Sequence, residues 1–233
     1  MRFSRSERFA AVLPPLPHAA KQRPIFCYVT DQRGISLTAG PADLLALIER
    51  AGAATVDWIQ IREKDLSARE MLELSRRAVA AAGTTTKILV NDRLDVALAA
   101  GAAGVHLGGE SAPIAEVVRW CRAGHAPAEF LVGASCHSLA EVLAAESGGA
   151  NYVFFGPVFA TPSKLPYGSP QGIERLAEVC HDARIPVIAI GGITTANTED
   201  CLRAGAAGIA AIRLFQQAAD MAALIKQLRA KQI

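Results

Sequence analysis

The phrase Ala100-Gly101-Ala102-Ala103-Gly104 occurs again, unchanged, as Ala204-Gly205-Ala206-Ala207-Gly208, and a shorter form, Gly148-Gly149-Ala150, lies between the two. Each phrase follows a stretch with helical period and precedes a short apolar run. Glycine readily adopts the left-handed conformation that ends many helices, so each phrase predicts a helix that stops and leads straight into a buried strand. This recurring joint indicates an α/β protein built from repeated units.

The rest of the chain divides in the same way, because short β-rich runs alternate with longer helical stretches. The eight predicted strands are Ile25–Thr30, Val56–Ile61, Lys87–Val90, Gly104–Leu107, Phe130–Gly133, Tyr152–Phe155, Pro186–Ile190 and Gly208–Ile212. The eight predicted helices are Pro41–Ala51, Ser67–Ala82, Leu94–Ala100, Ile114–Cys121, Leu139–Ser147, Gly172–Asp182, Thr195–Ala204 and Gln217–Lys231. Eight such units favour a closed (β/α)8 TIM barrel, a single domain over residues 23–233, and an open doubly wound sheet is the alternative.

Two helix starts carry the spacing of a capping box, in which a hydroxyl and a carboxylate three residues later satisfy each other's backbone N–H groups. Ser67 is followed by Glu70, and Ser138 is followed by Glu141. Both pairs predict a helix that begins directly after the serine.

Composition points to a soluble globular protein that acts on small molecules. Of the 233 residues 51% are hydrophobic, and the formal net charge is +2 with the basic residues dispersed, which argues against a nucleic-acid partner. No apolar run reaches the length of about 20 residues that spans a bilayer. The apolar patch near the basic N-terminus is cut by Pro14 and Pro15 and is too short for a signal peptide, so residues 1–22 are expected to be a poorly ordered extension outside the barrel.

The five cysteines are widely spaced, odd in number and contain no C-x-x-C pair, which excludes a disulfide framework and a zinc knuckle. We expect most of them to be buried in a reducing compartment, which predicts a cytoplasmic protein. Cys136 has no evident base nearby in the sequence and is not expected to be a nucleophile.

The run Gln60-Ile61-Arg62-Glu63-Lys64 follows the second predicted strand. Alternate side chains of an extended segment share a face, so Gln60, Arg62 and Lys64 would point the same way at the end of the barrel where active sites lie. An amide with two cations suits a phosphate or a diphosphate, whereas the alternative is a solvated charged turn. Further cations and hydroxyls that favour a diphosphate come from other strand ends, namely Ser135, Thr161, Ser163 and Lys164.

Asn91 and Asp92 follow the third strand and could hold Mg²⁺, which takes one or two carboxylates together with phosphate oxygens, or they could cap the next helix. His137 could transfer a proton or only brace its neighbours. Gly191-Gly192 lies beside the eighth strand, where barrels often bind one phosphate, although a tight turn would also need glycine.

Six motifs in order make the chain similar to the thiamine phosphate synthase family, and to its relatives the thiazole tautomerases, over about residues 23 to 230. The motifs are Gln60-Ile-Arg62-Glu-Lys64, Val90-Asn91-Asp92-Arg93, Val105-His106-Leu107-Gly108, Gly133-Ala-Ser135-Cys-His137-Ser138, Phe155-Gly156-Pro157-Val158-Phe159 and Ala189-Ile190-Gly191-Gly192-Ile193-Thr194. The resemblance implies a transferase that joins 4-amino-5-hydroxymethyl-2-methylpyrimidine diphosphate to a thiazole monophosphate, releases pyrophosphate and uses Mg²⁺.

The resemblance also implies which residues do this. The pyrimidine diphosphate site would comprise Gln60, Arg62, Lys64, Asn91, Ser135 and Lys164. The thiazole phosphate site would comprise Thr161, Ser163, Gly192, Ile212 and Arg213. The residues expected to act in catalysis are Arg62, Lys64, Ser135, His137 and Lys164.

The sequence differs from the synthase pattern at two positions. Ser111 stands where the family has a second metal-binding Asp, so Glu110 beside it is predicted to join Asp92 in holding Mg²⁺, and Arg213 replaces a small hydroxyl residue. The alternatives are a thiazole tautomerase that uses His137 as acid and base, and a non-catalytic binder of thiamine precursors. The expected partners are small-molecule substrates, with no nucleic acid and no membrane, and a homo-oligomer stays open.

Overall fold

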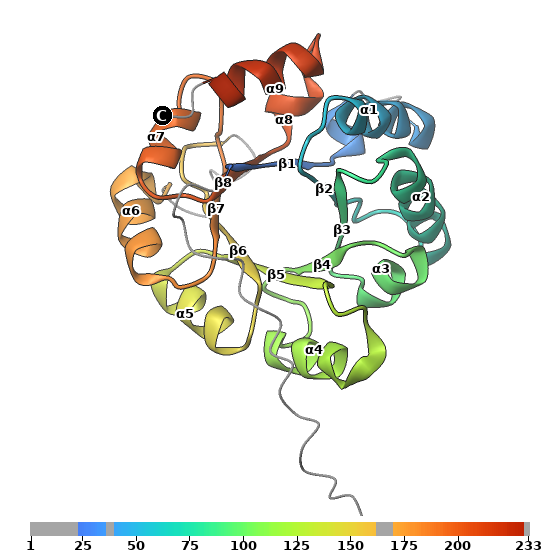
Figure 1. The fold of residues 1–233 in the computed structure, drawn as a ribbon, viewed down its shortest axis with the longest axis horizontal. Coiled ribbons are helices and arrows are strands. Elements are labelled where there is room, and N and C mark those ends of the chain that lie inside the picture. The colour runs from blue at the N-terminus through green and yellow to red at the C-terminus, as the bar shows by residue number, and fades with distance from the viewer. Residues whose placement is uncertain (1–22, 36–39, 162–169, 231–233) are drawn as a thin grey trace, which may run out of the picture.

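The computed structural model describes residues 23–35, 40–161 and 170–230, and these form a closed barrel of eight parallel strands in sequence order (Figure 1). The strands are β1 Ile25–Val29, β2 Trp58–Ile61, β3 Lys87–Asn91, β4 Gly104–Leu107, β5 Leu131–Cys136, β6 Tyr152–Phe155, β7 Val187–Ile190 and β8 Gly208–Ala211. Pairing of β1 with β8, in a register that begins Ile25↔Gly208, closes the ring. The predicted (β/α)8 barrel is therefore confirmed, and the open sheet is excluded.

Helices surround the ring of strands (Figure 1). The α-helices are α1 Pro41–Ala53, α2 Ala68–Ala81, α3 Leu94–Ala100, α4 Ile114–Trp120, α5 Leu139–Ser147, α6 Gly172–Asp182, α7 Thr198–Arg203, α8 Arg213–Gln216 and α9 Met221–Ala230. A short 3₁₀ turn, η1 Gln32–Gly34, follows β1, and a π turn, η2 Cys121–His125, follows α4. The sequence predicted neither turn.

Two differences from the predicted bounds have local reasons. The helix predicted over Gln217–Lys231 begins later, as α9 at Met221, where Asp220 accepts a hydrogen bond from the Ala223 backbone N–H at 2.9 Å, and the short α8 before it was not predicted. Strand β5 runs three residues further than predicted, to Cys136, and this extension places Ser135 on the strand itself.

The recurring glycine phrases behave as predicted. Gly101 and Gly205 have φ of 68° and 97°, and Gly149 in the shorter phrase has 86°. The capping box of Ser67 and Glu70 is complete. That of Ser138 is half formed, because the Glu141 carboxylate accepts from the His137 backbone N–H at 2.7 Å instead of from Ser138.

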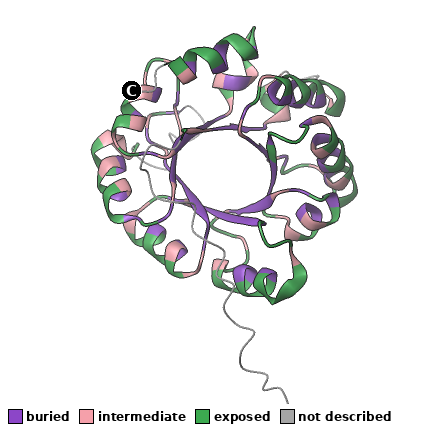
Figure 2. Cartoon of the chain, in the orientation of Figure 1, coloured by how far each residue is buried: buried purple, intermediate pink, exposed green. Residues whose placement is uncertain are grey.

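Apolar residues pack in two clusters, one on each side of the strands. The larger cluster joins the outer faces of the strands to the helices, which bury their inner stripes against it (Figure 2). The smaller cluster fills the barrel interior with Cys27, Val29, Trp58, Leu89, Leu131, Tyr152, Phe154, Ile188 and Ala210. These apolar side chains pack beneath the polar side chains at the carboxyl ends of the strands.

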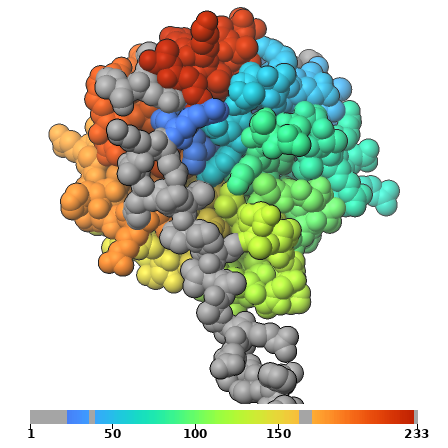
Figure 3. All heavy atoms as spheres, in the orientation of Figure 1, coloured from blue at the N-terminus to red at the C-terminus, as the bar shows by residue number. Residues whose placement is uncertain are grey.

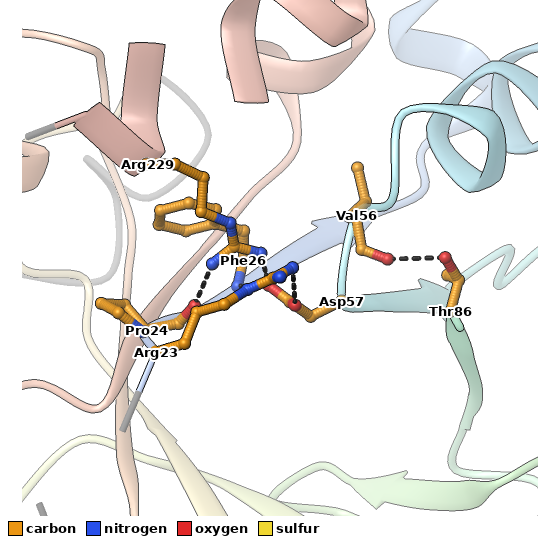
Figure 4. Close-up of polar contacts among 7 residues, drawn as sticks. All are labelled: Arg23, Pro24, Phe26, Val56, Asp57, Thr86 and Arg229. Atoms are coloured by element: carbon orange, nitrogen blue, oxygen red, sulfur yellow. Dashed lines mark hydrogen bonds and ion pairs between the residues drawn. The ribbon is translucent and has the colours of Figure 1, made fainter. Parts of the chain in front are cut away.

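The amino-terminal end of the barrel is held by a cluster of paired charges around Asp57 (Figure 4). Asp57 accepts from the Phe26 backbone N–H at 2.8 Å, from Arg229 at 2.5 Å and from Arg23 at 3.0 Å. Arg229 also donates to the Pro24 carbonyl at 2.5 Å and lies 4.3 Å over the Phe26 ring. The cluster ties α9 to the starts of β1 and β2, so the first strand and the last helix lie side by side (Figure 3).

Four of the five cysteines are buried, Cys180 is half-buried, and all are free, as predicted. Among the described helices, none combines the length and the apolar character needed to cross a membrane.

Candidate active site

Gln60, Asn91 and Asp92 form a chain of hydrogen bonds at the carboxyl ends of β2 and β3. The Gln60 amide is buried, with 2% of the residue exposed, and its Nε2 donates to Asn91 Oδ1 at 2.7 Å. Asn91 Nδ2 in turn donates to Asp92 Oδ2 at 2.6 Å. Within the described residues Gln60 Oε1 has no partner, so this end of the chain holds a buried acceptor that a ligand could satisfy.

In the segment after β2, Glu63 is the buried residue. Its carboxylate accepts from Thr30 Oγ1 at 2.5 Å and from the Gln32 backbone N–H at 2.9 Å, while Thr30 Oγ1 accepts from the Arg62 backbone N–H at 2.9 Å. Burial raises the pKa of Glu63, and repulsion by Asp31 adds to the effect. These contacts anchor the backbone on which half-buried Arg62 and exposed Lys64 flank Glu63.

Lys64 faces a cavity of about 280 Å³. Its walls are Glu63, Lys64, Leu66, Met71, Asn91, Asp92 and Arg93. The structure thus brings together Lys64, Asn91 and Asp92, which come from two different loops and were predicted to share a site.

Asp92 has a backbone conformation that is rare outside glycine, with φ of 59°. Its Oδ1 accepts from the Gly108 backbone N–H at 2.9 Å and from the Ser111 hydroxyl. Helix α3 begins at Arg93 without a side-chain cap, so the interpretation of Asn91 and Asp92 as caps is wrong. The strained turn and its three hydrogen bonds instead fix the carboxylate at the barrel mouth.

The metal prediction joined Asp92 with Glu110, whereas the residue in contact with Asp92 is Ser111. Glu110 is exposed. No group of three or more His, Cys, Asp or Glu side chains in the described residues is arranged to hold a metal ion. A carboxylate beside a hydroxyl nevertheless fits an ion such as Mg²⁺, which takes few protein ligands when phosphate oxygens and water supply the rest.

Ser135 lies on the inner face of β5 and contacts a buried histidine, His106 of β4. The Ser135 Oγ is 2.9 Å from His106 Nε2, and His106 Nδ1 is 3.1 Å from the Tyr152 hydroxyl. Burial lowers the pKa of His106 to about 3, which keeps the imidazole neutral. No role was predicted for His106, although its place between two apolar residues, Val105 and Leu107, was a signal in the sequence.

His137 lies beyond β5 and is exposed. Its Nδ1 is 2.5 Å from the Gly156 carbonyl oxygen, so Nδ1 carries the donated proton and Nε2 is left as an acceptor. The ring therefore braces the β6 loop while keeping one nitrogen available. Burial raises the pKa of neighbouring Cys136 to about 12, in agreement with the expectation that this thiol is no nucleophile.

Gly191 and Gly192, after β7, allow two loops to pack together. Their φ values are 96° and 67°, and a Cβ on them would lie 2.5 Å from Pro157 and 2.6 Å from the Phe159 Cβ. The tight-turn interpretation thus accounts for the pair by itself, and the phosphate site stays a prediction. Gly192 and Arg213 line the same cavity of about 670 Å³, between the β7 loop and helices α8 and α9.

The remaining predicted residues fall into two groups. Thr161 is buried after β6, and Ile212 is half-buried directly after β8. Ser163 and Lys164 lie outside the described residues. Ser135, Gly192, Ile212 and Arg213 all follow or end strands at the same end of the barrel as Gln60 and Asn91, as a (β/α)8 fold requires.

Comparison with known proteins gives a consistent result. The family model described as thiamine monophosphate synthase matches residues 26–215. A putative thiamine-phosphate synthase of Geobacter sulfurreducens is 48% identical over 177 residues, which is 75% of this chain and 80% of the relative. A thiamine-phosphate synthase of Chloroflexus aurantiacus is 42% identical over 194 residues, 79% of this chain and 83% of the relative.

A solved structure agrees with these sequences. Thiamine phosphate pyrophosphorylase from Pyrococcus furiosus superposes with a TM-score of 0.76 and 32% sequence identity, covering 90% of this chain and 95% of the other. The similarity therefore extends over nearly the whole barrel.

Proposed function

The chain belongs to the thiamine monophosphate synthase family, and from this premise we propose that it condenses 4-amino-5-hydroxymethyl-2-methylpyrimidine diphosphate with a thiazole monophosphate. The products would be thiamine monophosphate and pyrophosphate. Family membership implies an enzyme of thiamine biosynthesis and a transferase. The substrates and the roles of the residues below are our proposal.

The observation that carries the proposal is the cavity that Lys64 lines together with Asn91 and Asp92. Arg62 precedes Lys64 by two residues on the same segment, and neither side chain forms a hydrogen bond or an ion pair with another described residue. Two cations, one planar and one compact, suit an anion with more charge than a carboxylate. We assign the diphosphate to this cavity.

The heterocycle of the same substrate would then lie toward the barrel axis. The buried Gln60 Oε1 there lacks a partner within the described residues, and a substrate amino group could donate to it. Below it the interior is lined by aromatic rings, with His106 and Phe154 centroids 4.2 Å apart, and flat apolar surfaces of this kind stack well against a heterocycle.

The second substrate carries one phosphate, and we assign it to the cavity lined by Gly192 and Arg213. The backbone after β7 and β8 is where (β/α)8 proteins often bind a phosphate. Arg213 is exposed and adds a cation to this wall. Thr161 and Ser163 would contribute to it from the segment after β6, whereas Lys164 would join Arg62 and Lys64 at the diphosphate.

Catalysis in this arrangement would consist of stabilising a departing anion. The bond between the pyrimidine methylene carbon and the diphosphate oxygen breaks, the electron pair leaves with the diphosphate, and the thiazole nitrogen then forms the new C–N bond. Arg62, Lys64 and the Ser135 hydroxyl are preorganised donors for the charge that develops on the leaving group. No protein nucleophile is needed, which agrees with the burial of Cys136.

Mg²⁺ would be held by Asp92 and Ser111, with diphosphate oxygens and water completing its coordination. When bound, the ion would neutralise part of the charge on the diphosphate. Glu110, the partner predicted from the sequence, is exposed, and the neighbouring side chain that bonds to Asp92 is that of Ser111.

The direct test is an assay of the purified protein with both substrates and Mg²⁺, in which thiamine phosphate is oxidised to fluorescent thiochrome. We expect product that depends on both substrates. If no product forms at any Mg²⁺ concentration, the synthase proposal is wrong.

One observation favours a second candidate, a thiazole tautomerase. His137 is held through Nδ1 by the Gly156 carbonyl, and its Nε2 is left as an acceptor that could take up a proton. This activity would use a thiazole carboxylate phosphate alone and would leave Arg62 and Lys64 without a diphosphate. Conversion of the isolated thiazole tautomer to its aromatic form, followed by ultraviolet absorbance, would identify it.

We also propose a cytoplasmic location, which the free cysteines support. Residues 23–233 are proposed to form one domain, with residues 1–22 as an extension. Size-exclusion chromatography with light scattering would decide whether the protein is a homo-oligomer.

A further inference from the structure

A buried chain of polar groups crosses the barrel interior from Tyr152 on β6, through His106 on β4, to Ser135 on β5. His106 Nδ1 is 3.1 Å from the Tyr152 hydroxyl and His106 Nε2 is 2.9 Å from Ser135 Oγ, so both contacts are within hydrogen-bond distance. Tyr152 is 0% exposed and His106 is 1% exposed, so water cannot replace either contact. Ser135 is half-buried at the mouth and is the one member of the chain that a substrate can reach.

Gly133 makes this chain possible. In the barrel register His106 is opposite Gly133, and Gly133 is opposite Tyr152, so one residue on β5 separates the two side chains. A Cβ at position 133 would lie 2.0 Å from the Tyr152 Cζ atom. The tyrosine ring therefore occupies the space above the glycine, and its hydroxyl reaches across the intervening strand to the histidine.

The hydrogen bonds of the chain fix where each proton lies. His106 Nδ1 is the one hydrogen-bond partner of the Tyr152 hydroxyl among the described residues, so this buried O–H must donate to Nδ1 to be satisfied. Nδ1 is then an acceptor, and the proton of the neutral imidazole is on Nε2. Nε2–H donates to Ser135 Oγ. The hydroxyl hydrogen of Ser135 is consequently directed away from His106.

We infer that His106 is a positioning residue that turns the Ser135 hydroxyl into a hydrogen-bond donor toward the barrel mouth. The inference rests on the proposed function, in which Ser135 donates to the diphosphate oxygen that receives the electron pair as the C–O bond breaks. Ser135 keeps its proton throughout. With the opposite tautomer, the hydroxyl would donate inward to Nε2 and present a lone pair to the anion.

Two substitutions of His106 separate positioning from packing. In His106→Gln the amide nitrogen can reach the place of Nε2, whereas in His106→Asn the shorter amide reaches only the place of Nδ1. We expect His106→Asn to lower kcat on the order of 10-fold to 100-fold, somewhat less than loss of a donor to a developing anion. The KM for the diphosphate should change much less, since the interaction strengthens as charge develops. His106→Gln should recover most of the activity.

His106→Asn combined with Ser135→Ala tests whether His106 acts through Ser135. If it does, His106→Asn causes no further loss of kcat once the hydroxyl is gone. An equal loss in both backgrounds, or full kcat in the His106→Asn single variant, would overturn the inference. Circular dichroism and thermal unfolding of each variant establish that it is folded. If His106→Asn does not fold, Tyr152→Phe, which removes the hydroxyl that donates to His106, replaces it in the same comparison with Ser135→Ala.

The tautomer of His106 can also be measured directly, without an activity assay. In protein labelled with ¹⁵N-histidine, long-range ¹H–¹⁵N correlation spectra distinguish a protonated Nε2 from a protonated Nδ1, and His106→Gln identifies the resonance by its loss. We expect the Nε2–H form, and the Nδ1–H form would refute the inference. If the native protein makes no thiamine phosphate, the proposed function fails, while the spectrum still decides the state of His106.

Discussion

The two ends of the barrel use charged residues in opposite ways. At the amino-terminal end, Asp57 and Arg229 are about one-fifth exposed and bond to each other and to the backbone of residues 24 and 26 (Figure 4). At the carboxyl-terminal end, Arg62 and Lys64 form no side-chain ion pair with another described residue. A charge that is already paired contributes to folding, whereas a charge held on an anchored loop without a partner is available to an anionic ligand.

The difference lies in what surrounds each group. Asp57 receives three donors, from Arg23, from Phe26 on β1 and from Arg229 on α9, so removing it leaves an arginine and a buried N–H without this acceptor. The loop of Arg62 and Lys64 is instead held by its neighbour Glu63, which bonds to Thr30 and Gln32. Anchoring and function are thus divided between adjacent residues, and substitutions should separate them.

The largest effect is expected on activity at the carboxyl-terminal end. Arg62→Ala and Lys64→Ala should each lower kcat/KM on the order of 100-fold to 1,000-fold, because each removes a preorganised donor to the departing diphosphate. The midpoint of thermal unfolding should stay within about 2 °C of the native value, since neither side chain supports the fold. Arg119→Ala, which removes an exposed i,i+3 ion pair on α4, is the matched control and should change neither quantity.

The next effect is expected on stability at the amino-terminal end. Asp57→Ala should lower the free energy of unfolding by about 3 kcal/mol, because it breaks a partly buried charge cluster and leaves its partners unpaired. For a domain of this size that corresponds to roughly 6 to 12 °C in Tm. Urea unfolding measures the loss. Unchanged stability, or a fall in kcat at a temperature where the variant is folded, would contradict the division between the two ends.

A smaller effect is expected at the metal position. Ser111→Asp should add a second carboxylate beside Asp92 and lower the dissociation constant for Mn²⁺ about tenfold, which electron paramagnetic resonance can follow without substrate. Glu110→Gln should leave Mn²⁺ binding unchanged, because Glu110 is exposed and Ser111 is the residue that bonds to Asp92. If Glu110→Gln weakens binding instead, Glu110 rather than Ser111 completes the site.

The smallest effect concerns pH. Burial, with repulsion from Asp31 and partial relief from Arg62, raises the pKa of Glu63. The folded state therefore holds this proton more tightly than the unfolded state, so the stabilising contribution is complete below the ordinary pKa of Glu and is lost as pH rises through the raised value. Glu63→Gln should remove this part of the pH dependence, measured as the difference in unfolding free energy between native protein and variant. A difference independent of pH would refute it.

Much of the fold could be predicted from the sequence because its signals are local. Helix-ending glycines such as Gly101 and Gly205, and the serine of the Ser67 cap, act within a few residues of themselves. Every one of the eight strands was placed to within a few residues. The later start of α9 was missed because it depends on Asp220, whose side chain accepts a hydrogen bond from Ala223 in a stretch that otherwise has the composition of a helix.

The parts of the candidate site that lie on one segment could be predicted from the sequence. The contacts between side chains from different strands and loops could not. Gln60, Arg62 and Lys64 could be grouped by alternation, whereas the contacts of Ser111 with Asp92 and of His106 with Ser135 join segments 19 and 29 residues apart. The role of Gly133 depends on a ring from another strand that lies over it. Such contacts follow from the closure of the barrel and leave no pattern in a single segment.

The most direct measurement is a calorimetric titration of inorganic pyrophosphate with Mg²⁺ into the native protein and into the Arg62→Ala/Lys64→Ala double variant, together with the unfolding midpoint of each. We predict binding by the native protein, at least about 100-fold weaker binding by the variant, and the same unfolding midpoint. Equal affinity for pyrophosphate in the two proteins, or a variant that unfolds at a much lower temperature, would contradict the assignment of these two cations to ligand binding.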